Sequence, residues 1–285
     1  MINKNLYIIG ATGFVGRRFC QYLLDQNYDE KINLFFCARD LNKLSKYFPS
    51  KDVNSRFIKI KLDTLNQKDI NQLSEASYVA NFVGTFDLYA EKIIAYCAYN
   101  GIHYFDITGE FHFIKKMIQK YDEQAKKTLA TIIPFSGFDS IPTEILANKS
   151  IQQFELENQK PPTKLSIIYK VKGGLNGGTL LSALNFSGKT STKDLLNLHY
   201  LCKNKQKIIS PTKTTYFPSI SEHASAFFME SINSKVLFRG FFLQNKDIIF
   251  NDLEYREYLS LGKSTPSIIH QINTLGLIGF NLLMK

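Results

Sequence analysis

The sequence has few cysteines, and their arrangement argues against a small domain held together by disulfide bonds or by a metal ion. Its 285 residues include only Cys20, Cys37, Cys97 and Cys202, which are scattered and form no C-x-x-C pair. Isolated cysteines in apolar segments are typical of buried, reduced thiols in a cytoplasmic protein, and not of a disulfide framework. The histidines do not cluster at metal-ligand spacing, so we expect no metal site.

Long hydrophobic runs are also missing. The first apolar run, 6–9, passes directly into a glycine-rich turn, so we expect no targeting signal there. Segment 264–284 carries no Lys, Arg, Asp or Glu, but Pro266, His270 and Asn273 interrupt it, and its apolar stretches fall short of the roughly 20 residues of a membrane span. We expect a helix docked on the protein or on a partner, with peripheral membrane contact as the alternative.

The chain has an excess of positive charge, but no concentration of it. A formal net charge of +10 arises from 35 basic and 25 acidic residues spread along the sequence. Without a recognised nucleic-acid motif, this distribution argues against a nucleic-acid partner. It favours acidic small ligands such as phosphates, acyl carriers or anionic lipid headgroups.

What the sequence does contain is a glycine loop near its start, LYIIGATGFVG at 6–16. A short buried strand turns sharply into a helix expected over 13–26, whose first N–H groups and positive dipole end suit a pyrophosphate. The glycines allow the turn, the approach of the anion and close helix–strand packing. The predicted cofactor-binding residues of this loop are Gly10, Thr12, Gly13, Phe14, Val15 and Gly16.

The second expected strand, 32–38, determines which dinucleotide is favoured. In a dinucleotide fold its end reaches the adenine ribose, where a carboxylate binds a 2′-hydroxyl and an arginine accepts a 2′-phosphate. Arg39 lies about 20 residues beyond Gly16, as this motif expects, and Lys43 follows on the next turn. These two residues favour NADP(H), and Asp40 keeps NAD open as the alternative.

The rest of the first half alternates strands with helices. We expect further strands at 56–62, 78–84, 103–107 and 131–134, and helices at 89–100 and 110–126. Six strands in this alternation predict an α/β fold with a Rossmann-type, doubly wound parallel sheet. Asp63 could meet the adenine edge or cap the helix after it. Val83, Gly84 and Thr85 are placed to border the nicotinamide ribose.

After Ala147 the composition changes, and the regular alternation ends. We therefore divide the chain into an NAD(P)-binding domain at 1–147 and a second, smaller mixed α/β domain for substrate binding or dimerisation at 148–285. A polar linker runs through 159–162, with strands at 165–172, 236–244 and 247–253 and a helix at 196–207. The glycine pairs at 173–178 form either a flexible loop or a backbone flap over substrate.

Three residues beyond the ends of the last two parallel strands are candidates for catalysis. Reduction by a nicotinamide needs a group that supplies a proton or stabilises developing negative charge. Glu110, Asp139 and Ser140 lie on the carboxyl side of the sheet, where ligands of this architecture bind. The alternative is that each of them caps the helix that follows it.

Four sequence segments follow one another in an order typical of a known family. They are GATGFVGR at 10–17, NFVGTF…DITGE at 81–110, SGFDSIPTE at 136–144 and GGLNGGTLLSAL at 173–184. Together they resemble the saccharopine dehydrogenase-like oxidoreductases, in the branch of the trans-acting enoyl reductases. The resemblance implies an NAD(P)-binding Rossmann domain, a smaller mixed α/β domain and an active cleft between them. It also implies that the DITGE and GFDSIP blocks line that cleft.

The combined expectation is an NADP(H)-dependent oxidoreductase that reduces a C=C or C=O bond of a small or carrier-bound, acyl or lipid-like substrate. Short-chain dehydrogenase chemistry is disfavoured, because the one Tyr and Lys pair at the required spacing, Tyr47 and Lys51, flanks Pro49. A non-catalytic, NADP-binding regulatory or lipid-associated protein of the same fold is the second alternative. A homodimer remains open.

Overall fold

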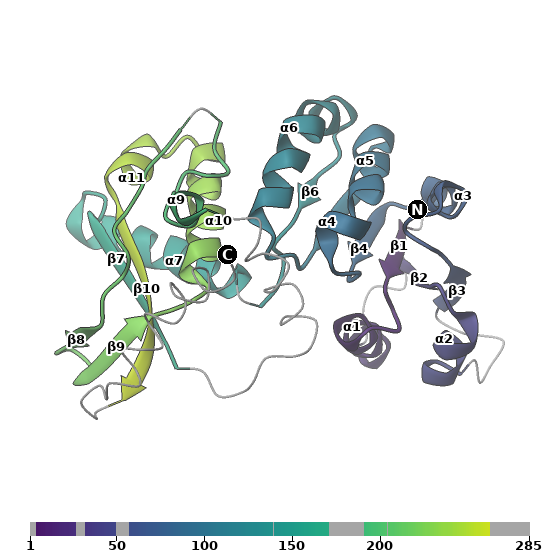
Figure 1. Cartoon of the computed structure of the whole chain (residues 1–285), viewed down its shortest axis with the longest axis horizontal. Helices are drawn as coiled ribbons and strands as arrows, with labels where there is room; N and C mark the ends of the chain where they lie inside the picture. The colour runs from purple at the N-terminus through teal and green to yellow at the C-terminus, as the bar shows by residue number, and fades with distance from the viewer. Residues whose placement is uncertain are drawn as a thin grey trace. The chain divides into compact units, whose positions relative to one another are not determined.

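A computed structural model describes residues 4–26, 32–49, 57–138, 140–170, 191–203 and 205–262 (Figure 1). The chain divides into two compact units, Met1–Ser136 and Gly137–Lys285. The domain boundary expected after Ala147 therefore lies inside a helix of the second unit.

The first unit is built on a six-stranded parallel sheet of order β3-β2-β1-β4-β5-β6. Its strands are β1 (Lys4–Ile9), β2 (Ile32–Ala38), β3 (Phe57–Lys61), β4 (Tyr78–Asn81), β5 (His103–Asp106) and β6 (Ile132–Ile133). The order reverses beside β1, which pairs with β2 on one side and with β4 on the other. This confirms the predicted doubly wound sheet, and it places the ligand-binding crevice of such folds at the carboxyl ends of these strands.

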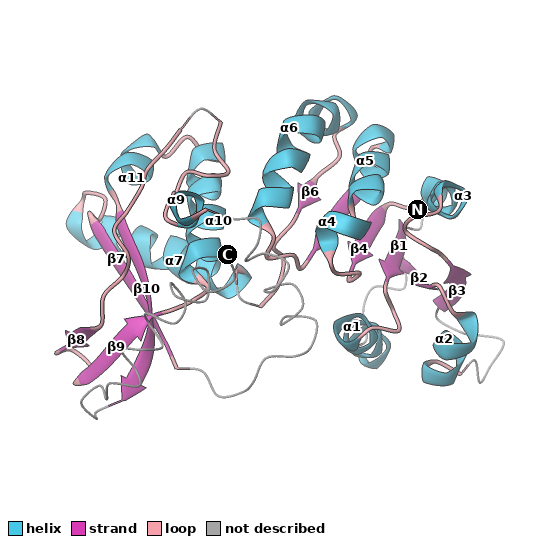
Figure 2. Cartoon of the chain, viewed as in Figure 1, coloured by secondary structure: helices cyan, strands magenta, loops and turns pink. Residues whose placement is uncertain are grey.

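Helices cover both faces of this sheet (Figures 1 and 2). They are α1 (Phe14–Asp25), α2 (Leu41–Tyr47), α3 (Gln67–Ile70) with the 3₁₀ turn η1 (Asn71–Glu75), α4 (Phe86–Tyr89), α5 (Glu91–Asn100) and α6 (Phe111–Thr128). In Figure 1, α1 and α2 lie on one face, and α5 and α6 on the opposite face. A core of buried side chains from β1, β2, α1 and α2 fixes the first face: Leu6, Ile8, Cys20, Leu34, Phe36 and Leu44.

The second unit contains a mixed four-stranded sheet of order β7-β10-β9-β8. Its strands are β7 (Lys164–Tyr169), β8 (Thr215–Phe217), β9 (Glu222–Ala226) and β10 (Glu254–Gly262), and its helices are α7 (Ile141–Asn158), α9 (Thr192–Leu195), α10 (Glu230–Leu243) and α11 (Asp247–Asp252). Strand β10 runs parallel to β7 and antiparallel to β9. The expected mixed α/β character of the second half is confirmed.

Several elements expected in the second half are wrong in type. Segments 236–244 and 247–253 were predicted as strands but lie in α10 and α11, because a short apolar run gives no period that separates a buried strand from a buried helix. The expected helix 196–207 is a loop, held by the Asn197 side chain, which accepts from the His199 and Lys207 amides. The linker expected at 159–162 does lie directly after α7, a helix whose buried Thr143, Ala147 and Ile151 recur at helical spacing.

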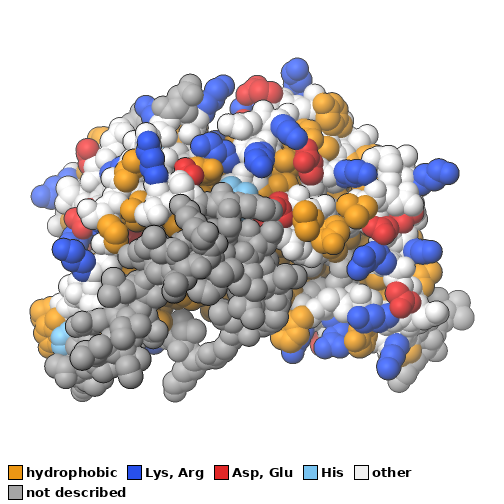
Figure 3. Space-filling view, viewed as in Figure 1, with side chains coloured by type: hydrophobic (Ala, Val, Ile, Leu, Met, Phe, Trp, Pro, Cys, Tyr) orange, Lys and Arg blue, Asp and Glu red, His pale blue; other side chains and the backbone are white. Residues whose placement is uncertain are grey.

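Other expectations are met or lie outside the described part of the chain. The four cysteines are buried and free of disulfides. Among the described residues, no helix is both long and apolar enough to cross a membrane. Lys and Arg side chains are scattered over the face seen in Figure 3, in keeping with the spread of charge along the sequence. The predicted glycine-rich loop at 173–178 and the apolar segment 264–284 lie outside the described residues.

Candidate functional site

The glycine loop joins β1 to α1 as a single tight turn. Gly10 has φ +85°, in the left-handed region that glycine tolerates best, and its N–H donates to the Cys37 carbonyl at 3.1 Å. A Cβ on Gly16 would lie 2.3 Å from the Gly10 oxygen, so α1 packs on the turn at a distance that only glycine permits. The sequence therefore builds a strand–turn–helix unit with the chain direction that pyrophosphate binding requires.

The first turn of α1 carries no negative charge. Gly13 is the N-cap, no side chain caps the helix, and no acidic residue lies in its first turn. The first amides of a helix have no intrahelical acceptor, so those of Phe14, Val15 and Gly16 point toward any ligand in front of the helix. Thr12 is half-buried beside them. This arrangement favours binding of an anion.

The residues at the end of β2 bear on the choice between NAD(H), which Asp40 would favour, and NADP(H), which Arg39 and Lys43 would favour. The Asp40 carboxylate caps α2, accepting from the amides of Asn42 at 2.8 Å and Lys43 at 3.1 Å. Arg39 and the Lys43 side chain are exposed. β2 pairs with β1 up to Ile9 and Cys37, and the Gly10 amide donates to the Cys37 carbonyl, so the backbone at Arg39 lies two residues beyond a contact with the glycine loop.

Asp63, the other candidate on the adenine side, serves the backbone at the end of β3. Its carboxylate accepts from the Leu65 amide at 3.0 Å, and its carbonyl accepts from Asn66 at 3.0 Å. The N-cap of α3 is Asn66, whose side chain accepts from Lys68, so Asp63 shapes the turn before the helix and does not cap it. Its predicted contact with the adenine stays a prediction.

The predicted residues after β4 lie directly against the glycine loop. Phe82 donates its amide to the Ile9 carbonyl at 2.9 Å, and a Cβ on Gly10 would lie 3.0 Å from Cγ2 of Val83. Asn81 is fully buried and accepts from the Val83 amide at 3.1 Å. Thr85 is the N-cap of α4 and makes no side-chain cap of its own. The loops after β1 and β4 therefore form one continuous surface.

Glu110 reaches from the loop after β5 to the start of α4. Its side chain is almost completely buried, and its two oxygens accept from the amides of Phe86 at 3.1 Å and Asp87 at 2.9 Å. It does not cap α6, the helix that follows it, by a side-chain hydrogen bond. Burial, assisted by the Asp87 carboxylate, raises the pKa of Glu110 to about 7, although the two amide donors oppose this shift.

A buried hydrogen-bond chain fixes the loop that carries Glu110. The Tyr104 hydroxyl donates to Asp106 at 2.7 Å and accepts from the Asn81 side chain at 3.1 Å. Asp106 also accepts from the Thr108 amide at 3.0 Å, and the Thr108 hydroxyl accepts from the Glu110 amide at 3.0 Å. Burial raises the pKa of Asp106 to about 6. Sequence reasoning placed these residues at the strand ends but missed the part played by Tyr104.

Asp87, Glu110 and His112 form a compact group whose ligand atoms lie within 4.8 Å of one another. Carboxylate and imidazole donors of this kind are acceptable to several divalent metals. Glu110, however, already accepts from two amides at the positive end of α4, which favours an anchoring role for this carboxylate over metal binding. The expectation of no metal stays a prediction.

The other two catalytic candidates are placed differently. Ser140 belongs to the second unit, where its buried hydroxyl donates to the Asn233 side chain at 2.9 Å. Asn233 in turn donates to Glu257 at 3.0 Å, and Tyr255 donates to the other oxygen of Glu257. Ser140 is thus part of a buried polar network between α7, α10 and β10. Asp139 lies outside the described residues.

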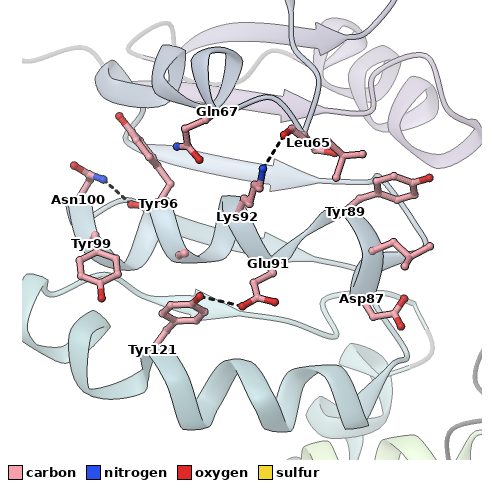
Figure 4. A pocket seen from close by; sticks show the side chains of 13 residues that line it. Leu65, Gln67, Asp87, Tyr89, Glu91, Lys92, Tyr96, Tyr99, Asn100 and Tyr121 are labelled. Carbon is pink, nitrogen blue, oxygen red and sulfur yellow. Dashed lines mark hydrogen bonds between the residues drawn. The ribbon is translucent and has the colours of Figure 1, made fainter.

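A groove of about 550 Å³ lies along α5 on the outer side of the first unit (Figure 4). Two of its charged side chains are already engaged: Lys92 donates to the Leu65 carbonyl at 2.8 Å, and Glu91 accepts from Tyr121 at 3.1 Å. None of the predicted cofactor-binding residues lines it. The groove is therefore separate from the surface formed by the glycine loop and the loop after β4.

Comparison with known proteins agrees with this geometry. Residues 6–133 match the family model described as saccharopine dehydrogenase NADP binding domain. The chain is 28% identical over 202 residues to a lipid droplet localized protein of Caenorhabditis elegans, covering 68% of this chain and 47% of that protein. It is also 28% identical over 183 residues to a protein of Mycobacterium tuberculosis provisionally named a trans-acting enoyl reductase, covering 63% of this chain and 43% of that one.

A solved structure extends the likeness to most of the chain. Saccharopine dehydrogenase (L-Glu forming) from Saccharomyces cerevisiae superposes with a TM-score of 0.51 at 14% identity, covering 90% of this chain and 55% of that one. At this identity the likeness concerns the fold alone. The chain spans less than half the length of the two relatives above, 47% and 43%.

Proposed function

Because residues 6–133 carry the NADP-binding domain of the saccharopine dehydrogenase family, we propose that the protein is an NADP(H)-dependent oxidoreductase. We propose further that it reduces a C=C or C=O bond of an acyl or lipid-like substrate by hydride transfer. The names of two relatives, a lipid droplet localized protein and a trans-acting enoyl reductase, support this substrate class. The substrate in this proposal is a small acyl compound or an acyl group bound to a carrier.

The cofactor assignment rests on one observation, the different surroundings of two charged residues at the end of β2, Asp40 and Arg39. One carboxylate oxygen of Asp40, Oδ1, accepts from two amides of α2 and holds this side chain at the start of the helix, while Arg39 is exposed at the end of β2. A guanidinium is a strong, bidentate partner for a phosphate. This arrangement favours NADP(H) over NAD(H).

The chemistry assigns different tasks to the cofactor and to the chain. When bound, the nicotinamide supplies the hydride. The chain must hold the cofactor, exclude water and provide a proton or a charge-stabilising group. Among the candidates, Glu110 has both oxygens on backbone amides and suits an orienting task, while Asp139 is retained as a candidate proton donor.

A titration with NADPH and NADH tests the cofactor assignment. Arg39→Ala is expected to weaken NADPH binding by about 10-fold or more, the scale of a charged hydrogen bond, and to leave NADH binding nearly unchanged. Lys46→Ala removes the same charge from the other end of α2 and is the matched control. If the unaltered protein binds neither nucleotide, the proposal fails.

A second candidate function is NADP(H) binding without turnover. The observation in its favour is that both described catalytic candidates, Glu110 and Ser140, spend their polar atoms on buried structural bonds. Oxidation of bound NADPH by enoyl- and keto-acyl substrates distinguishes the two functions. A cytoplasmic location, a homodimer and peripheral membrane contact through 264–284 stay predictions.

A further inference from the structure

Glu110 is anchored at both ends. Its amide donates to the Thr108 hydroxyl at 3.0 Å, in the loop fixed by Asp106, and its carboxylate lies across the start of α4. The hydrogen bonds to Phe86 and Asp87 span 24 and 23 residues of sequence. Glu110 therefore joins the loop after β5 to the loop after β4.

Among the described residues, Glu110 is the side chain that caps helix α4. The N-cap residue, Thr85, makes no side-chain capping bond, so the described acceptors for the first two amides of the helix are the oxygens of Glu110. Two amide donors require two acceptor atoms. A carboxylate presents two, whereas a glutamine presents one and turns an NH₂ group toward the second donor.

The position of α4 determines the position of the turn before it. Residues 82–85 connect β4 to α4, and Val83 lies against Gly10 so closely that a Cβ on the glycine would come within 3.0 Å of its Cγ2. A shift of the first turn of α4 would therefore move the backbone that borders the glycine loop. On the β4 side, Asn81 holds the Val83 amide at 3.1 Å, so Glu110 supplies the second of two anchors.

We propose that Glu110 is a positioning residue of the cofactor site: its buried carboxylate holds the N-terminus of α4 and thereby fixes turn 83–85 for the nicotinamide half of NADP(H). The inference rests on the proposed NADP(H)-binding function. It assigns Glu110 a task distinct from that of a proton donor, because an anchor acts on binding of the cofactor and a proton donor acts on turnover.

The test compares two nucleotides that occupy different parts of the site. NADPH reaches turn 83–85, whereas adenosine 2′,5′-bisphosphate has no nicotinamide half and engages only the glycine loop and Arg39. Glu110→Ala is expected to weaken NADPH binding about 10-fold, the scale of lost charged hydrogen bonds, and to change binding of the bisphosphate by less than about 2-fold. Glu110→Gln, which keeps one acceptor, is expected to fall between Glu110→Ala and the unaltered protein.

Glu91→Ala is the matched control, because Glu91 begins α5 but pairs with Lys120 and Tyr121 instead of the α4 amides. It should leave the affinities for both nucleotides unchanged. Hydrogen exchange gives a second readout: in Glu110→Ala the amides of Phe86 and Asp87 should exchange faster, with or without nucleotide.

Three outcomes would overturn the inference. The first is wild-type NADPH affinity in Glu110→Ala. The second is an equal loss of NADPH and bisphosphate binding in both Glu110 variants, which would indicate general damage. The third is reduced turnover in Glu110→Gln with unchanged NADPH affinity, which would restore the proton-donor role. Failure of the unaltered protein to bind NADPH would instead count against the proposed function, and the exchange measurement would still show whether Glu110 holds α4.

Discussion

Asp40 and Glu110 are two carboxylates that a reading of the sequence treats as ligand or acid, and both hold backbone amides at a helix start. Asp40 acts locally, on residues two and three positions ahead, which is the usual range of an N-cap side chain, although from the sequence we considered it only as a ribose ligand. Glu110 acts on Phe86, 24 residues back along the chain. No local sequence pattern predicts such a partner, because the contact depends on how β4 and β5 pair.

The glycines of the loop differ in how strictly they are required. A Cβ at position 16 would come within 2.3 Å of the Gly10 oxygen, whereas a Cβ at position 13 would lie 3.1 Å from the same atom. Gly16→Ala is therefore expected to lower the free energy of unfolding by roughly 1–3 kcal/mol, the cost of overpacking, and Gly13→Ala by less. Urea unfolding monitored by circular dichroism measures both. Equal costs in the two variants would contradict the packing argument.

At the scale of elements, the first unit was predictable, whereas in the second unit the strand β7 was predicted but two helices were not. In the parallel sheet short strands alternate with helices along the chain, and this alternation identifies the elements without tertiary information. In the second unit, α10 buries Leu237, Phe238 and Phe241 but also Asn233 and Lys235. A helix with polar residues on its buried side has no clear apolar face, so its sequence was read as a strand.

The residues of the candidate site also fall into a group that the sequence predicts and a group that it does not. Residues that act through their own backbone, such as Gly10 and Gly16, follow from local spacing. Residues that act through contacts between distant elements, such as Glu110 on α4 and Ser140 on α10, require the fold to be known. The sequence placed both near strand ends, but it could not identify their partners.

The network around Ser140 leads to a prediction about how α7, α10 and β10 are held together. Asn233 accepts from Ser140 and donates to Glu257, and all three side chains are buried. Asn233→Ala removes these bonds, together with a longer one to the Thr143 hydroxyl, and is expected to destabilise the second unit by about 1–3 kcal/mol, the usual cost of breaking buried hydrogen bonds. Asn158→Ala, at the exposed end of α7, is the control. Chemical unfolding of both variants measures the difference, and equal stabilities would contradict a structural role for the network.

At the scale of the whole molecule, two buried carboxyl groups of the first unit and one buried lysine of the second contribute opposite pH dependences to stability. In the first unit, burial raises the pKa of Asp106 to about 6 and of Glu110 to about 7, above their unfolded values of 3.8 and 4.5. The native state then binds more protons than the unfolded chain between those limits, so this unit loses stability as pH rises from about 5 to 7.

In the second unit, burial lowers the pKa of Lys235 from 10.5 to about 7, while its ammonium donates to the carbonyls of Leu195 and Ser231. Here the unfolded chain binds more protons above pH 7, so the second unit gains stability as pH rises from about 7 to 8.5, by at most about 1.4 kcal/mol per pH unit for one group.

Hydrogen exchange mapped to each unit at about pH 5, 7 and 8.5, and corrected for intrinsic rates, should show protection of the first unit falling over the lower interval and protection of the second rising over the upper one. Glu110→Gln should flatten the first trend, since a neutral amide cannot titrate, and Lys235→Met should flatten the second. A second unit whose protection still rises in Lys235→Met would show that another group carries the dependence. If protection in both units instead follows one common pH profile, the two units unfold together. The opposite effects of Glu110 and Lys235 then add in a single free energy of unfolding.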